Sequence, residues 1–89
     1  MMIDQLKIES TLLAYLETYH PECGRIEVET DLIESGQLDS LVLVDLVQVL
    51  KSHFQLEVQP QDITPKHFRS LRAIAELTIA RLAAPRRAA

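Results

Sequence analysis

The central stretch of the chain reads SLVLVDLVQVLKSHF at residues 40–54. Its many β-branched residues would suit a strand locally, but fifteen residues without a glycine or proline exceed an ordinary strand. Apolar side chains also recur on one helical face, at Leu43, Leu46, Val47, Leu50 and Phe54. Asp39 and Ser40 offer suitable N-cap side chains at the start. We therefore expect a helix over residues 40–54.

Toward the N-terminus, a second amphipathic pattern predicts a helix from about residue 3 to residue 19. Its apolar residues recur at helical spacing, at Ile3, Leu6, Leu12, Leu13, Leu16 and Tyr19. Pro21 and Gly24 should end this helix, because proline disfavours helical geometry in the residue before it and glycine lets the chain turn. Residues 25–38 then form a long loop, with one short helical turn near residues 31–34 and with Leu32 and Ile33 as its apolar anchors.

Toward the C-terminus, residues 55–61 form a polar connection, and Pro65 is expected at the first position of a short helix that runs through Phe68. Ser70 is a suitable cap for a last helix. The apolar face of that helix is expected to contain Leu71, Ile74, Ala75, Leu77, Thr78 and Leu82. The fold class is therefore all-α, a small bundle of three longer helices and one short helix. Residues 1–84 should form a single domain, and residues 85–89 a disordered tail.

Composition limits the class of protein. A chain of 89 residues with 47% hydrophobic side chains can form one compact domain. The single cysteine, Cys23, cannot form an internal disulfide, and no apolar stretch is long enough to cross a membrane or to serve as a secretory signal, so we expect a cytoplasmic protein without a membrane span. Residues 1–60 contain three basic and eleven acidic side chains, a balance that argues against nucleic-acid binding.

Sites for catalysis or for a metal are not expected. A serine hydrolase would need a histidine beside Ser40, yet His53 lies thirteen residues further along the same helix, about 20 Å away. His20 and His67 are isolated in the sequence and are expected to face solvent. The stretch from His20 to Cys23 offers two metal ligands where a structural zinc site needs four.

Positive side chains near the C-terminus form a second pattern. Lys66, Arg69 and Arg72 are spaced three apart, so they would form a basic stripe if one helix continued through Ser70. Such a stripe is most often a solvated face, and a secondary contact with a partner is the alternative.

Ser40 stands at the start of the central helix and at the end of a long loop. Its hydroxyl can therefore project beside the positive end of the helix, where an attached phosphate is favoured. The residues alone leave a second interpretation open, in which Ser40 or Asp39 only caps the helix, because serine is common at helix starts.

A pattern that covers almost the whole chain resembles the acyl carrier proteins. It consists of Leu32, the motif Gly36-Gln37-Leu38-Asp39-Ser40-Leu41, the residues VDLVQVL at 44–50 with Phe54, and Phe68-Arg69-Ser70-Leu71 before a final helix. The resemblance implies a four-helix bundle that has no catalytic residues of its own. A phosphopantetheinyl transferase would attach 4′-phosphopantetheine from coenzyme A to Ser40, which Asp39 and Leu41 flank in the attachment motif. The resulting phosphoprotein would carry its cargo as a thioester.

Within this family, the chain resembles free-standing carriers such as the D-alanyl carriers and those of secondary metabolism. Gly36 stands four residues before the serine, whereas fatty-acid carriers usually place glycine three before. The central helix contains only one acid, Asp45, where fatty-acid carriers have several. By helical geometry the docking face contains Leu41, Val44, Asp45 and Gln48.

These departures favour dedicated partners over generic fatty-acid enzymes. We expect a monomer that takes an acyl or aminoacyl group from an activating ligase and delivers it to a downstream acyltransferase or synthase in a biosynthetic route. Two alternatives stay open: an aminoacyl or peptidyl carrier of the D-alanyl type, and an unmodified helical module for protein interaction.

Overall fold

The computed structural model describes residues 4–83, and the regular secondary structure within that range is all helical, with no strand. Four α-helices follow in order: α1 (Gln5–Tyr19), α2 (Ser40–Phe54), α3 (Pro65–Phe68) and α4 (Leu71–Ala83). Two short 3-10 turns, Pro21–Cys23 and Pro60–Asp62, lie in the connections. The expected bundle of three longer helices and one short helix is confirmed. The expected tail over residues 85–89 lies outside the described residues.

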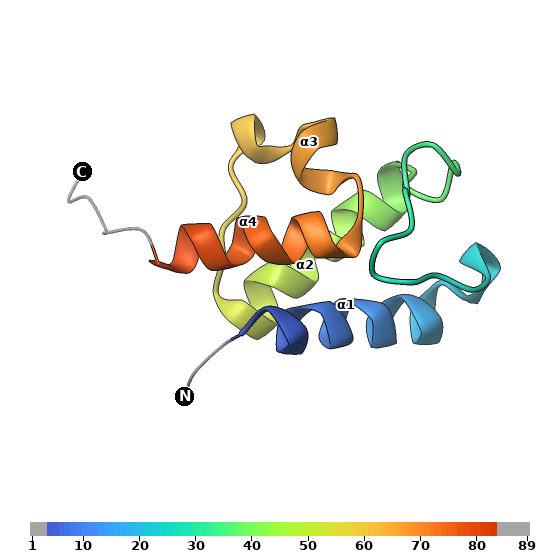
Figure 1. Cartoon of the computed structure of the whole chain (residues 1–89), viewed down its shortest axis with the longest axis horizontal. Coiled ribbons are helices and arrows are strands. Elements are labelled where there is room, and N and C mark those ends of the chain that lie inside the picture. The colour runs from blue at the N-terminus through green and yellow to red at the C-terminus, as the bar shows by residue number, and fades with distance from the viewer. Residues whose placement is uncertain (1–3, 84–89) are drawn as a thin grey trace.

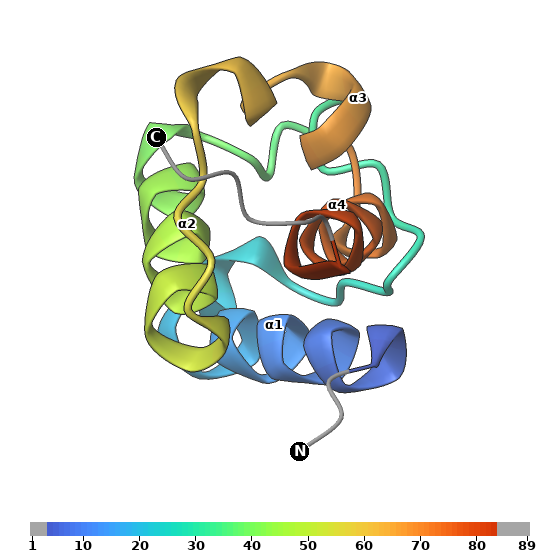
Figure 2. The same ribbon diagram turned by 90° about the vertical axis from the view of Figure 1, so that its left-hand side faces the viewer.

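The helices are arranged around α4. Figure 1 shows α1 and α4 side by side, with α3 on the other side of α4. In Figure 2, α4 is seen end-on between α1 and α3, and α2 closes one side of the bundle. The long loop from α1 to α2 closes the opposite side. Residues 25–38 are therefore part of the framework, because they cover a face that no helix covers.

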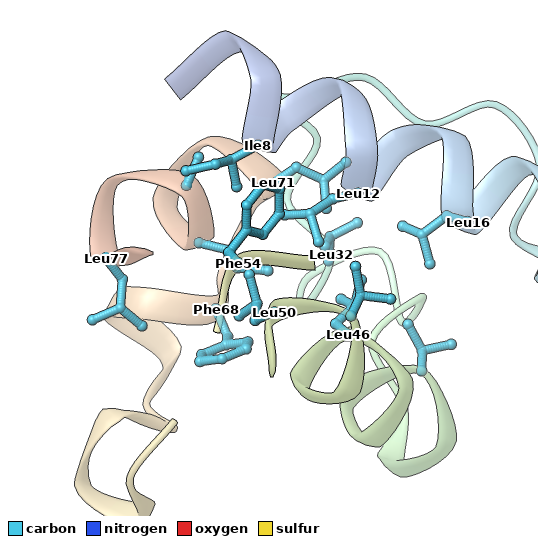
Figure 3. Packing of buried hydrophobic residues seen from close by; sticks show 14 of the residues in the cluster. Ile8, Leu12, Leu16, Leu32, Leu46, Leu50, Phe54, Phe68, Leu71 and Leu77 are labelled. Atoms are coloured by element: carbon cyan, nitrogen blue, oxygen red, sulfur yellow. The ribbon is translucent and has the colours of Figure 1, made fainter. Parts of the chain in front are cut away.

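The core is aliphatic and draws on every helix (Figure 3). Leu12 and Leu16 from α1 and Leu46 and Leu50 from α2 belong to the same buried cluster, and all four are at most 1% exposed. The remaining buried apolar residues from α3, α4 and the loops include Leu32, Phe68, Leu71, Ile74 and Leu77. Burial of each such side chain stabilises the fold by roughly 1.5–3 kcal/mol relative to exposure. The core therefore fixes how α2 sits on α1 and α4.

The predicted buried face of α1 is partly wrong. Leu6 and Tyr19 are 74% and 65% exposed, whereas Ile8 is fully buried. The buried set runs Ile8, Leu12, Leu16, a spacing of four, and it includes the acid Glu9. The apolar residues of this helix fit two overlapping helical faces. The face that packs inside is the one that also contains the polar residue Glu9, which made it harder to identify from the sequence. Ile3, where we expected the helix to begin, lies outside the described residues.

Smaller differences of the same kind occur in α2 and α4. In α2, Val42 and Val49 are buried, while Leu43 and Val47 only pack against the rim of the core. In α4, Leu82 is 40% exposed, although the other predicted apolar residues of this helix are buried. Helix bounds were thus easier to predict than the direction of each side chain.

The loop between α1 and α2 is attached to α4 by backbone hydrogen bonds. The Leu32 N–H donates to the Arg69 carbonyl at 2.7 Å, and the Arg72 N–H donates to the Val28 carbonyl at 2.9 Å. Leu32 is 1% exposed and is an anchor as predicted, but Ile33 is 41% exposed, so its prediction as an anchor is wrong. The expected short helical turn near residues 31–34 is present as a hydrogen-bonded turn, in which the Ser35 N–H donates to the Asp31 carbonyl at 3.1 Å.

The predicted basic stripe does not form as one helical face. α3 ends at Phe68 and α4 begins at Leu71, so the helical spacing is interrupted between Lys66 and Arg72. The two arginines are also engaged in ion pairs: Arg69 lies 3.7 Å from the carboxylate of Asp31, and Arg72 lies 3.2 Å from that of Glu29. Both side chains therefore face acids of the long loop and do not form a free basic stripe.

Candidate functional site

Capping of α2 is done by Asp39 and not by Ser40. Asp39 has extended backbone geometry, and its carboxylate accepts a hydrogen bond from the Val42 N–H at 2.9 Å. Ser40 is the first residue of the helix and is exposed to solvent. Because the neighbouring acid satisfies the free amide at the helix start, the Ser40 hydroxyl is not needed for the cap. The exposed hydroxyl is thus available for chemistry beside the positive end of the helix.

The segment that leads into Ser40 is held at several points. The Gln37 side-chain amide donates to the Cys23 carbonyl at 2.6 Å, and the Leu38 N–H donates to the Leu32 carbonyl at 2.9 Å. Gly36 has a φ of +79°, a left-handed conformation that L side chains rarely adopt. The left-handed conformation explains why a glycine stands four residues before the serine, because the chain turns at Gly36 before it enters α2.

The surface next to Ser40 is apolar. Leu41 and Val44 on the outer side of α2 are 63% and 56% exposed, and Gln48 is exposed one turn further along. The two apolar residues are therefore not buried against the preceding loop. Together with Gln48 they form a continuous strip along the helix. Asp45 lies beside this strip, with a side chain that is 29% exposed.

The expectation that His20 faces solvent is wrong. His20 is 5% exposed and lies where α1 ends and the Pro21–Cys23 turn begins. Its Nε2 is 2.6 Å from a carboxylate oxygen of Asp45, and its Nδ1 is 3.0 Å from one of Glu22. Hydrogen bonds to Glu22 and to Asp45 raise the pKa of His20, although burial acts in the opposite direction. No pattern in the sequence indicates the contact with Asp45, which joins residues 25 positions apart.

A small apolar hollow is lined in part by residues that come shortly before and after Ser40 in the sequence. It has a volume of about 180 Å³ and lies between the long loop, the start of α2 and α3. Its lining consists of Ile33, Leu38, Leu43, Ile63, Thr64, Pro65 and Phe68. Leu38 and Leu43 flank Ser40 in the sequence, so this hollow is close to the serine along the chain.

A family model described as a phosphopantetheine attachment site matches residues 10–78, which include the loop, Ser40 and all of α2 and α3. The chain belongs to this family. Such a chain is a carrier of 4′-phosphopantetheine and is not itself catalytic, and it must meet a phosphopantetheinyl transferase and further enzymes. A search of curated proteins finds no significant match. Membership of the family thus identifies the cofactor and the carrier role, but it does not identify the cargo.

The residues at the start of α2 fit this carrier's prosthetic group. A phosphoester needs an accessible hydroxyl, which Ser40 has, and the amide groups of a helix N-terminus favour a phosphate. Within residues 4–83 no cluster of three or more histidine, cysteine or acidic side chains is suited to a metal ion, and no helix there is long and apolar enough to cross a membrane. Cys23 is partly buried, and burial raises the pKa of its thiol.

Proposed function

We propose that this carrier bears 4′-phosphopantetheine on Ser40 and transports an acyl or aminoacyl group as a thioester between enzymes. The observation that carries the proposal is the exposed Ser40 hydroxyl, released from capping by Asp39, inside the span of the family match. When bound, the prosthetic group supplies the thiol that forms the thioester. The chain's own part is to present Ser40 and to be recognised.

Each residue of the proposed attachment motif has a separate task. Asp39 holds the first turn of α2 through the Val42 N–H, so the helix starts at the serine. Ser40 provides the oxygen of the phosphoester. Leu41, 63% exposed, provides apolar contact to an enzyme that approaches the serine. A phosphate at this helix end would be favoured by roughly 0.3–1 kcal/mol at an exposed position.

We further propose that enzymes dock on the outer face of α2, formed by Leu41, Val44, Asp45 and Gln48. Exposed apolar side chains next to a reactive position are typical of contact surfaces. The scarcity of free acids on this face favours dedicated partners: an activating ligase that loads the carrier and an acyltransferase or synthase that unloads it. We also propose that the carrier acts as a free-standing monomer in the cytoplasm.

The apolar hollow beside Ser40 bears on the cargo. A volume of about 180 Å³ is similar to that of an engineered protein cavity that binds benzene. The hollow could therefore accept a short apolar group, whereas a long chain would need α3 to move or would remain outside. Both a short acyl group and a small aminoacyl group satisfy this limit.

Mass spectrometry of the intact protein tests the attachment. The full chain is coexpressed with a broad-specificity phosphopantetheinyl transferase, and we expect a mass gain equal to one phosphopantetheine group. Ser40→Ala should abolish the gain. Ser52→Ala is the matched control, because Ser52 is an exposed serine on the same helix, and this variant should be modified like the parent chain.

The outcomes separate the alternatives. If several transferases leave the parent chain at its unmodified mass, the carrier proposal is wrong and the chain is better regarded as an unmodified interaction module. If Ser40→Ala is still modified, the carrier role stands but the attachment point is elsewhere.

A further inference from the structure

His20 is a buried titratable group in a protein that has no catalytic use for one. Of the three histidines, all within the described residues, only His20 is buried, at 5% exposure. It is in contact with α2, on which the proposed docking face lies, and with the turn that follows α1. A buried polar side chain in such a position needs partners, and its partners here are both acidic.

Both ring nitrogens of His20 face a carboxylate. Nε2 is 2.6 Å from Asp45 on α2, and Nδ1 is 3.0 Å from Glu22 in the Pro21–Cys23 turn. An ionised carboxylate only accepts hydrogen bonds, so both contacts are satisfied together when both ring nitrogens carry a proton. The geometry therefore describes an imidazolium between two anions.

The two contacts differ in how far solvent screens them. The Asp45 side chain is 29% exposed, whereas that of Glu22 is 66% exposed. A charge pair that is shielded from water interacts more strongly than an exposed one. The shorter contact, to Asp45, is also the more protected, so we regard Asp45 as the main partner of His20.

A metal ion does not explain this cluster. Asp45 and Glu22 contact different nitrogens of the same imidazole ring, so the two carboxylates and the ring cannot converge on one ion. Tyr15 of α1 also faces the cluster, with its ring centroid 6.2 Å from that of His20. Burial and the charge of Asp45 raise the pKa of Tyr15, so its phenol stays neutral near pH 7.

The cluster adjoins the start of α2. The Pro21–Cys23 turn that holds Glu22 receives a hydrogen bond from Gln37, three residues before Ser40, at 2.6 Å. The hydrogen bond to His20 lowers the pKa of Glu22, and the nearby charge of Asp39 opposes this shift; burial raises the pKa of Cys23, and the charge of Asp39 adds to that shift. A change at His20 would therefore be felt at the end of α2 that presents the serine.

We propose that His20 is a positioning residue for the outer face of α2: it holds the Asp45 carboxylate in an ion pair, so that this face meets a partner without a free anionic group. Asp45 is the only acid of α2. Because His20 balances the charge of Asp45, the neighbouring face of Leu41, Val44 and Gln48 fits a partner whose contact surface is apolar rather than basic. The statement about a partner rests on the proposed function, and the ion pair does not.

The pair makes the charge of this face dependent on pH. When His20 loses its proton, Asp45 becomes an unbalanced acid next to the apolar strip, and the same face would then attract a basic surface. The cluster of His20, Asp45 and Glu22 is thus expected to carry one net negative charge below the raised pKa of His20 and two above it.

NMR titration of the histidine ring in the full chain tests the ion pair. In the parent chain, both ring nitrogens of His20 should be protonated below about pH 6.5, the ordinary pKa of histidine, and the pKa of His20 itself should lie above that value. Asp45→Asn should shift that pKa downward. Glu17→Gln is the matched control, because Glu17 is an exposed acid near the end of α1 without an ion pair to His20, and it should cause no shift. An unchanged pKa in Asp45→Asn would overturn the ion pair.

The salt dependence of loading tests the consequence for a partner. The probe is a broad-specificity phosphopantetheinyl transferase with coenzyme A, and the readout is the rate of mass gain at low and high salt. His20→Gln, which keeps a hydrogen-bonding side chain but no charge, should make this rate more dependent on salt than in the parent chain, because Asp45 is then free. Spectra of the variant must first show the parent fold.

The outcomes of the two measurements are distinct. Equal salt dependence in the parent chain and in His20→Gln would overturn the effect on docking, even if the ion pair is present. If the transferase modifies neither chain, the proposed function fails and the inference about a partner fails with it, whereas the NMR titration still decides the ion pair.

Discussion

Two groups of ion pairs hold surface segments of this carrier to its bundle, and they use different cations. On the α4 side, Arg81 binds the buried Asp62, and Arg72 lies 3.7 Å from the buried Glu9. On the Ser40 side, the cation is His20. Arginine remains charged at every pH at which the protein folds, whereas histidine can lose its charge near neutral pH.

The difference separates a permanent framework from an adjustable one. The arginine pairs fix the Pro60–Asp62 turn, α1 and the long loop to α4, away from Ser40. The histidine pair fixes the end of α1 to α2, next to the proposed docking face. The element that pH can alter is thus the one closest to the function. The following variants test this contrast, in order of their expected effect on stability.

The largest loss is expected when the buried acid of the α4 side is removed. Asp62 is 1% exposed, accepts from Arg81 and also caps the Pro60–Asp62 turn through the Gln59 N–H at 3.1 Å. Asp62→Ala should lower the free energy of unfolding by about 2 kcal/mol, measured by urea denaturation. Asp4→Ala is the control, since it removes the exposed cap of α1 without breaking a buried pair, and it should cost about 1 kcal/mol. Equal losses would show that the pair with Arg81 adds no stability.

A smaller loss is expected at Arg72. Arg72→Met leaves the Glu9 carboxylate buried without a cation, although Gln5 still donates to it at 2.9 Å. Urea denaturation should show a loss of about 1 kcal/mol. Arg69→Met provides the comparison, because the pair of Arg69 with Asp31 is exposed and should contribute almost nothing. A loss at Arg69 as large as that at Arg72 would contradict the role of burial.

The dependence of stability on pH should have two separate edges. The raised pKa of His20 means that its contribution is complete below about pH 6.5 and is lost as the pH rises through that raised pKa. The pair with Arg81 lowers the pKa of Asp62, so this contribution is present above about pH 3.8 and is lost as the pH falls through the lowered pKa. Urea midpoints across this range should lose the alkaline edge in His20→Gln and the acid edge in Asp62→Ala. A variant that removes both edges at once would show that the two groups are not independent.

Those parts of the fold that depend on the residues of one helix alone could be predicted from the sequence. The bounds of α2 followed from an unbroken run of fifteen residues with Asp39 before it, and α3 followed from Pro65. The buried face of α1 could not be predicted, because Ile8 and Leu6 belong to two apolar ladders that only packing against α4 distinguishes. Local patterns state that a helix exists more reliably than they state which side is inside.

The candidate site shows the same division. Ser40 and the exposed strip could be predicted, since they depend on position along one helix and on a resemblance that covers the chain. The burial of His20 could not, because its acidic partners lie two and 25 positions away and no periodicity connects them. Two backbone hydrogen bonds join the long loop to the chain at the interruption between α3 and α4, from the Leu32 N–H to the Arg69 carbonyl and from the Arg72 N–H to the Val28 carbonyl, and no pattern in the sequence indicates them.

The smallest effect on stability, and a large one on loading, is expected for the apolar strip itself. Leu41→Ser should change the free energy of unfolding by less than about 0.5 kcal/mol, because the side chain is 63% exposed. The same variant should slow loading of Ser40 by a broad-specificity transferase about tenfold, the equivalent of about 1.4 kcal/mol of lost contact. Leu6→Ser is the control: Leu6 is 74% exposed on α1, and its loss should leave the rate of mass gain unchanged. If the two variants load equally fast, the transferase does not use the outer face of α2. A slowed Leu41→Ser with unchanged stability would separate recognition from folding at this surface.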